Sequence, residues 1–138
     1  MKLITRDTDY AVRVLIFLAH RKDETISVGE LASELGISHS FLRKICQILS
    51  KHNILTSHKG KGGGFSLTVQ PEEIYLTDLI TMFRGPFTLE KCIFIQKMCP
   101  ERNTCILRKE LEGIESYVTS RLRSITIDYL INPDQKKG

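Results

Sequence analysis

The sequence predicts a mostly α-helical protein with a small β-hairpin, arranged as a winged helix-turn-helix followed by a long C-terminal dimerisation helix. Three observations predict this fold. Two helical segments meet at a short glycine turn near residue 36, and a glycine-rich hairpin follows over residues 54–68. Apolar residues then recur at nearly heptad spacing over residues 107–125, as in a helix that packs against another helix.

The distribution of charge favours a polyanionic partner. The 138 residues carry a net charge of +4, but residues 35–71 contain five lysines and arginines and no acid, so this window alone carries +5. Residues 1–34 sum to −1 and residues 72–138 sum to 0, which restores the total of +4. Solubility does not require such segregation, but a polyanionic partner of the basic window would explain it.

The N-terminus does not resemble a signal peptide, and the longest apolar run is too short to span a membrane. The N-terminus carries acids where a signal peptide would be apolar, and the longest apolar run, residues 11–19, is interrupted by Arg13. We therefore expect a cytoplasmic protein without a membrane partner. Thiols stay reduced in that compartment, so clustered cysteines indicate metal binding or redox chemistry rather than structural disulfides.

The first two helices have recognisable starts. Apolar residues at helical spacing predict a helix from Thr8 to about His20. Ser27 and Glu30 form a capping box, in which each side chain can bond the other residue's backbone amide. This box predicts a short second helix that ends near Leu35.

The third helix completes a helix-turn-helix. Gly36 makes the turn, and Ser38 caps a helix that runs to about Lys51. The expected apolar stripe of this helix consists of Phe41, Ile45, Ile48 and Leu49. An ordinary antiparallel helix pair is the alternative, but the polar face of the third helix is basic, which favours DNA binding.

The hairpin favours a DNA-binding wing. Residues 54–57 and 65–68 are strand-like, and the stretch between them is rich in glycine and contains Lys59 and Lys61. Glycines let a backbone lie close to a sugar-phosphate surface, where lysines supply charge. The stretch lacks the G-x-x-x-x-G-K-S/T pattern and precedes a strand rather than a helix, so a nucleotide-binding loop is excluded. We expect no enzymatic activity.

The C-terminal half contains the remaining helices. A helix is expected from a cap at Thr77 to a stop at Gly85, and a short last helix from Ser124 or Thr126, before a frayed tail from Pro133. The long helix between them begins near residue 105. Its seam consists of Leu107, Leu111, Ile114, Val118 and Leu122.

This seam predicts a homodimer. Packing of the long helix against its own domain is the alternative, but the winged part is complete without it. The expected organisation is a DNA-binding domain over residues 1–85, a cysteine-containing loop over 86–105, and a dimerisation helix with a tail over 106–138.

Three cysteines, Cys92, Cys99 and Cys105, are spaced C-x6-C-x5-C in the loop. Structural zinc sites carry more closely spaced pairs, and a disulfide switch leaves one cysteine over. Cys105, near the start of a helix, gains from the helix dipole, which lowers the pKa of its thiol. Cys46 lies inside the third helix and is expected to be a small buried hydrophobe.

The chain resembles the Rrf2 family of bacterial transcription regulators over nearly its whole length. The resemblance rests on the three cysteines ahead of a long helix and on the motifs Met1-Lys2-Leu3, Thr8-Asp9-Tyr10-Ala11-Val12-Arg13, Leu35-Gly36-Ile37-Ser38 and Gly60-Lys61-Gly62-Gly63-Gly64. It implies a homodimer that binds a pseudo-palindromic operator. It also implies an iron–sulfur cluster, 2Fe–2S or 4Fe–4S, that controls DNA affinity and senses cluster supply, iron, nitric oxide or redox state.

The resemblance leaves the fourth ligand open. Family members that regulate cluster assembly use a histidine three residues after the last cysteine, where this chain has Arg108. The nitric-oxide sensors use an aspartate near the N-terminus of the other subunit, and Asp9 matches that motif. An apparent extra residue before the motif keeps Asp7 as an alternative, and Glu90, solvent or a small ligand are others. Nitric oxide is therefore the first expected signal, followed by iron or redox state.

Two further functions stay open at this point: a regulator without a cluster that senses thiol redox or a metabolite, and a regulator of iron–sulfur cluster biogenesis. By the family pattern, the start of the third helix faces the major groove and the wing tip lies at the minor groove or the phosphates. The expected DNA-binding residues are Ser38, His39, Ser40, Arg43, Lys44, Lys59, Gly60, Lys61 and Gly62.

Overall fold

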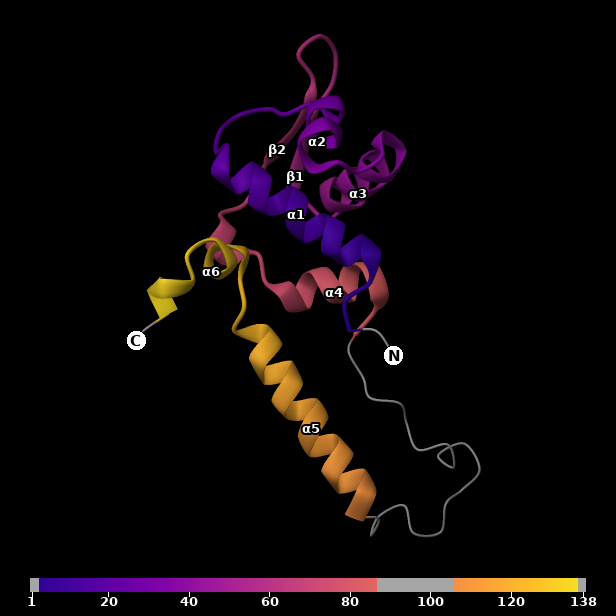
Figure 1. Cartoon of the computed structure of the whole chain (residues 1–138), viewed down its shortest axis with the longest axis vertical. Helices are drawn as coiled ribbons and strands as arrows, with labels where there is room; N and C mark the ends of the chain where they lie inside the picture. Colours follow the sequence, from indigo (N-terminus) through magenta and orange to yellow (C-terminus); the bar gives the residue numbers. More distant parts are fainter. Residues whose placement is uncertain (1–2, 87–105, 137–138) are drawn as a thin grey trace.

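The computed structural model describes residues 3–86 and 106–136. Figure 1 shows a helical body with a hairpin at one end and one long helix, α5 (Ile106–Arg123), that extends from the opposite end. This confirms a mostly α-helical fold with a two-stranded hairpin and a long C-terminal helix. No helix in the described ranges is long and apolar enough to cross a membrane.

Helix α1 (Arg6–His20) begins two residues before the predicted start at Thr8. The reason is a cap at Thr5, whose hydroxyl accepts a hydrogen bond of 3.3 Å from the Thr8 amide. The Thr8 side chain is fully buried, and its hydroxyl lies 3.0 Å from that of Thr5. The earlier start places Asp7, as well as Asp9, in the first turn of the helix.

Helix α2 (Val28–Leu35) begins at the predicted cap, where the Ser27 hydroxyl accepts a hydrogen bond of 3.1 Å from the Glu30 amide. It ends at Gly36, which adopts a left-handed conformation with φ of +65°. Since side chains make this conformation costly, glycine is the residue best suited to the turn. The turn leads directly into α3 (His39–Lys51), so the predicted helix-turn-helix is confirmed.

The buried stripe of α3 differs from the predicted one. Ser38 caps the helix as expected, its hydroxyl accepting a 3.4 Å hydrogen bond from the Phe41 amide. Phe41 itself, however, is 36% exposed. The residues of α3 that are buried in the core are Leu42, Ile45, Cys46 and Leu49. These follow the helical repeat from Leu42, which leaves Phe41 at the edge of the stripe.

The wing consists of β1 (Leu55–His58) and β2 (Gly64–Leu67), which pair antiparallel. A third segment extends this pairing, because Ile26 and Phe65 exchange backbone hydrogen bonds of 2.9 and 2.8 Å. Gly64 is needed at this junction, since a Cβ on it would overlap the carbonyl of Ile26. The base of the wing is therefore attached to the segment just before α2.

The C-terminal segment returns to the body. The turn η1 (Pro71–Glu73) leads to α4 (Leu76–Arg84), and Tyr75, before α4, pairs with Thr126 in an antiparallel bridge. The bridge keeps the backbone extended up to Tyr75, so α4 has no side-chain cap and the predicted cap at Thr77 is wrong. The Thr77 hydroxyl lies inside α4, buried and without a hydrogen-bond partner in the described parts of the chain.

Helix α6 (Ile127–Ile131) begins at Thr126, one of the two predicted starts, whose hydroxyl accepts a 3.0 Å hydrogen bond from the Tyr129 amide. Ile127 is fully buried and belongs to the same core as α1, α3 and the wing. The residues that follow form a short turn, η3 (Pro133–Lys136), rather than the predicted frayed tail. The winged body is therefore completed by the C-terminal end of the chain.

Candidate DNA-binding surface and sensor residues

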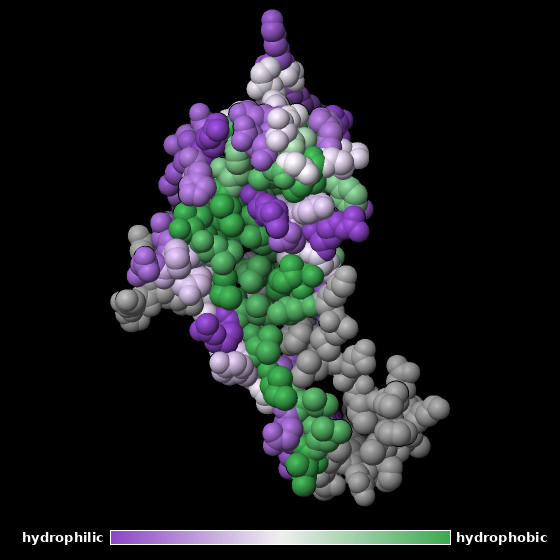
Figure 2. Space-filling view, viewed as in Figure 1, coloured by the Kyte–Doolittle hydropathy of each residue, from purple (hydrophilic) through white to green (hydrophobic). Residues whose placement is uncertain are grey.

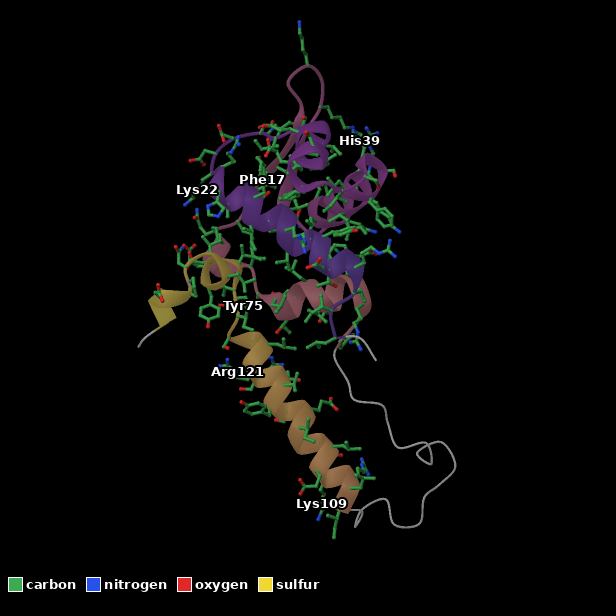
Figure 3. The ribbon with its side chains drawn as sticks, viewed as in Figure 1. Phe17, Lys22, His39, Tyr75, Lys109 and Arg121 are labelled. Carbon is green, nitrogen blue, oxygen red and sulfur yellow. The ribbon has the colours of Figure 1, made fainter. Side chains whose placement is uncertain are left out.

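The recognition face of α3 points away from the core. Its buried residues cover one side, and the residues predicted to read DNA lie on the other and are all exposed: Ser38, His39, Ser40, Arg43 and Lys44. Figure 3 shows His39 at the start of α3, at the end of the molecule that also carries the wing. Figure 2 shows that hydrophilic residues dominate this end.

The wing tip presents two lysines on a turn built from glycine. Gly60 and Gly62 adopt positive φ values of +91° and +78° with open space around them, and Lys59 and Lys61 are exposed beside them. These glycines therefore serve the turn, which also keeps the tip narrow. All four residues lie where a groove or a phosphate could reach them, at the point of the body most distant from α5 (Figure 1).

The basic side chains fall into two groups, those that form an ion pair with an acidic side chain and those that do not. Arg13 is paired with Asp9 at 3.0 Å, and Arg21 lies 3.6 Å from the carboxylate of Glu30. In contrast, no cation within residues 35–71 forms an ion pair with any described residue. A cation without an acidic partner is available to a phosphate. The positive charges of residues 35–71 are therefore free to bind the phosphates of DNA.

Only some of the predicted cluster ligands belong to the residues that the structure describes. Cys92, Cys99, Cys105 and the alternative ligand Glu90 fall outside the described residues, so their roles stay predictions. Within residues 3–86 and 106–136, no three or more His, Cys, Asp or Glu side chains gather where they could hold a metal ion.

Asp9 lies on the surface of α1, with its side chain 46% exposed and a carboxylate oxygen 3.0 Å from Nε of Arg13. In Figure 1 the start of α1 and the end of α4, from which the cysteine segment continues, lie on the same side of the molecule. Arg108, which replaces the histidine of the cluster-assembly regulators, pairs with Glu112 at 3.1 Å. A guanidinium cannot ligate iron, so Arg108 could not serve as the fourth ligand of a cluster.

Cys46 behaves as predicted for a buried hydrophobe. Its side chain is fully buried among the core residues of α3. Burial disfavours the charged thiolate and raises the pKa of the Cys46 thiol to about 12. The thiol is therefore protonated at neutral pH, whereas iron ligation requires a thiolate.

The seam of α5 is largely unburied within one chain. Leu107 is 66% exposed and Ile114 is 51% exposed, while Leu111 and Val118 are partly exposed. Leu122, at 7% exposed, is instead buried, near the end of α5 that meets α4. Figure 2 shows the apolar surface continuing from the body along α5.

Comparison with known proteins supports one family. A sequence profile of the Rrf2 family, described as iron-dependent transcriptional regulators, matches residues 4–133. The chain is 33% identical over 140 residues to the HTH-type transcriptional regulator NsrR of Halalkalibacterium halodurans, an alignment that covers 96% of this chain and 92% of that protein.

Two solved structures share the fold. CymR, the global cysteine regulator of Bacillus subtilis, superposes with a TM-score of 0.78 at 23% identity, covering 94% of this chain and 96% of CymR. IscR of T. potens superposes with a TM-score of 0.72 at 21% identity, covering 100% of this chain and 92% of IscR. With the winged helix-turn-helix and its unpaired basic face, these matches lead to one conclusion. The chain belongs to the Rrf2 family of DNA-binding transcriptional regulators, and it is not an enzyme.

Proposed function

We propose that this protein is a homodimeric regulator whose affinity for a double-stranded operator is controlled by an iron–sulfur cluster. The proposed ligands are Cys92, Cys99 and Cys105, with Asp9 of the second copy as the fourth. The observation that carries the proposal is the 33% identity to NsrR over 96% of the chain, together with the three cysteines that precede α5. The proposed signal is nitric oxide, with iron or redox state as the alternatives.

The donor set fits such a cluster. Thiolates are the soft ligands that iron–sulfur clusters take, and three of them leave one position for an oxygen ligand. Asp9 has an exposed carboxylate that is held by Arg13, so it is accessible without breaking the core. When bound, the cluster would supply iron that reacts with nitric oxide or oxidants, and a labile oxygen ligand suits a site of that kind.

The chain's own contacts connect Asp9 to the DNA-reading helix. Asp9 is on α1, and α1 packs against both α3 and α4. A ligand bond at Asp9 therefore acts on a helix that touches α3 directly. In a dimer, a change in the orientation of α3 alters the distance between two reading heads, which should lie about one helical turn of DNA apart.

A regulator without a cluster is the second candidate. The likeness to CymR, which is named as a cysteine regulator, shows that this fold also occurs in a protein with that role, although at 23% identity it shows the fold alone. In that case the three cysteines would act through thiol oxidation, or a metabolite would act elsewhere.

One measurement separates the two candidates: the visible spectrum, iron content and sulfide content of protein purified without oxygen. A cluster protein is coloured, contains iron and sulfide, and changes its spectrum and its DNA affinity on addition of nitric oxide. A colourless protein that also resists reconstitution with iron and sulfide would support the regulator without a cluster.

Replacing Asp9 with alanine should make the cluster labile. We expect loss of the cluster in air to be about ten times faster, because solvent replaces the carboxylate. The matched control is Asp7→Ala, which removes a carboxylate two residues away and should have no effect. The measurement is the decay of visible absorbance. If Asp7→Ala accelerates the decay and Asp9→Ala does not, the ligand is Asp7.

Removing Arg43 and removing Lys61 should affect DNA binding in different ways. Arg43→Ala should reduce the difference in binding free energy between the preferred base and the other bases by roughly 1–3 kcal/mol, because a guanidinium can bind a guanine through two hydrogen bonds. Lys61→Ala should weaken all sequences alike and flatten the dependence of affinity on salt. Competition binding with point-mutated operators, repeated across salt concentrations, measures both effects. Equal losses on every operator for Arg43→Ala would show that Arg43 contacts phosphate.

A further inference from the structure

The first turn of α1 is joined to the recognition helix by three side chains. The guanidinium carbon of Arg6 lies 5.5 Å from the centre of the Phe41 ring. Tyr10, one turn further along α1, meets the same ring edge-on, with 6.0 Å between ring centres and 89° between ring planes. We call Arg6, Tyr10 and Phe41 the Phe41 cluster.

The Phe41 cluster lies beside the residues expected to read DNA. Phe41 directly follows Ser40 in the first turn of α3 and is followed two residues later by Arg43, and both neighbours are exposed. Phe41 is not part of the buried stripe and is 36% exposed. Its ring therefore holds Arg6 at the edge of the recognition face rather than in the core.

The charge of Arg6 has no acidic partner among the residues that the structure describes. Arg6 is exposed and forms no ion pair with any residue of the described ranges, unlike Arg13 and Arg21 on the same helix. As the first residue of α1, its cation also faces the positive end of the helix dipole, so it does not stabilise the helix electrostatically. In this respect Arg6 resembles the unpaired cations of residues 35–71.

We propose that Arg6 extends the DNA-binding surface from α3 onto α1 by contacting a backbone phosphate beside the half-site. Phe41 and Tyr10 are the positioning residues. A guanidinium stacked on a ring uses its face for the ring and keeps its edge N–H donors free for phosphate oxygens. The inference rests on the proposal that the exposed face of α3 meets DNA.

The test is a salt titration of binding to a mixed-sequence DNA duplex, because phosphate contacts do not depend on sequence. Arg6→Ala should lower affinity on the order of tenfold per protomer near 0.1 M salt and reduce the slope of log affinity against log salt by about 0.9 per protomer. Arg6→Lys, which keeps the charge but not the planar fork, should retain the slope and lose part of the affinity.

Arg21→Ala is the matched control. Arg21 lies at the other end of α1 with its guanidinium carbon 5.1 Å from the centre of the Phe17 ring, so this change also removes a cation–ring contact. Figure 3 shows Lys22, the next residue, on the opposite side of the body from His39. Arg21→Ala should leave both affinity and slope unchanged. Thermal unfolding of each variant checks that the fold is kept.

A second change tests the positioning role. Phe41→Leu keeps an apolar side chain at the edge of α3 but removes the ring. In this background the further change Arg6→Ala should cost less affinity than it costs in the unchanged protein, because Arg6 is no longer held in place. Equal costs in both backgrounds would overturn the role of Phe41.

Two results would overturn the contact itself. One is an unchanged slope for Arg6→Ala, and the other is an equal loss for Arg6→Ala and Arg21→Ala. Lys61→Ala distinguishes this failure from a failure of the proposed DNA-facing surface. If Lys61→Ala flattens the slope and Arg6→Ala does not, only the inference about Arg6 is wrong. If neither change affects the slope, the surface is assigned to the wrong side of the body.

Discussion

Replacing Ile114 with glutamate should convert the proposed dimer into a monomer and lower the affinity for an operator at least about 100-fold. Ile114 lies in the middle of the seam of α5 and is 51% exposed within one chain, while its seam neighbours Leu111 and Val118 are partly exposed. Exposed apolar residues in one stripe along a helix lose their contact with water when a second copy covers them. A carboxylate buried in that contact has no partner, which opposes association strongly.

The effect on DNA binding follows from the loss of the second reading head. A dimer engages two half-sites at once, so its second contact benefits from a high effective concentration, typically worth about 10²–10⁴ in affinity. Sedimentation equilibrium measures the oligomeric state, and fluorescence anisotropy with an operator duplex measures the affinity. Both should change together.

Ser116→Glu is the control for this change. Ser116 is exposed on α5 and lies nearly opposite Ile114 around the helix. The glutamate at this position therefore adds the same charge as in Ile114→Glu, but outside the seam. It should leave the protein dimeric. A dimer that survives Ile114→Glu but not Ser116→Glu would mean that the opposite face of α5 forms the interface.

Replacing Cys99 with serine should abolish the cluster and, with it, the response to nitric oxide or iron. A serine hydroxyl is a harder and far less acidic ligand than a thiol, and two remaining cysteines cannot hold a cluster that is built for three. We expect protein purified without oxygen to be colourless and to contain almost no iron or sulfide. Its affinity for an operator should then be the same with and without nitric oxide.

Cys46→Ala is the control for loss of a thiol. Since Cys46 is buried in α3 and its thiol has a pKa of about 12, it should contribute nothing to metal binding. This variant should keep the full iron content and lose only about 1 kcal/mol of stability to the small cavity left in the core. Iron retained in Cys99→Ser but lost in Cys46→Ala would contradict the proposed ligand set.

Much of the fold could be predicted because local rules decide it. The hydroxyls of Ser27 and Ser38 cap helices by accepting bonds from amides three residues ahead, and Gly36 supplies the left-handed turn between those helices. Each of these signals lies within four residues of the bond that it makes. The position of the recognition face could be predicted as well, because the basic, polar side of the third helix has to face solvent.

The errors occurred where distant segments meet. Thr77 looks like a cap in the sequence, but Tyr75 is held extended by Thr126, which lies 51 residues further along the chain, so α4 begins without one. Helical spacing from Ile45 predicts Phe41 in the apolar stripe of α3. In the structure it meets Tyr10 of α1 instead of the core.

The amino-acid sequence was enough to predict the class of protein: a winged helix-turn-helix with a basic reading face, three cysteines and an apolar seam on the last long helix. Three features became visible in the folded chain: Ile127 completes the core, the seam from Leu107 to Val118 is not buried within one chain, and Arg6 lies beside the recognition helix. The reason is the distance along the chain over which each kind of interaction acts. Caps, turns and periodicity act over a few residues, whereas burial and contacts between helices depend on residues that the chain brings together only when it folds.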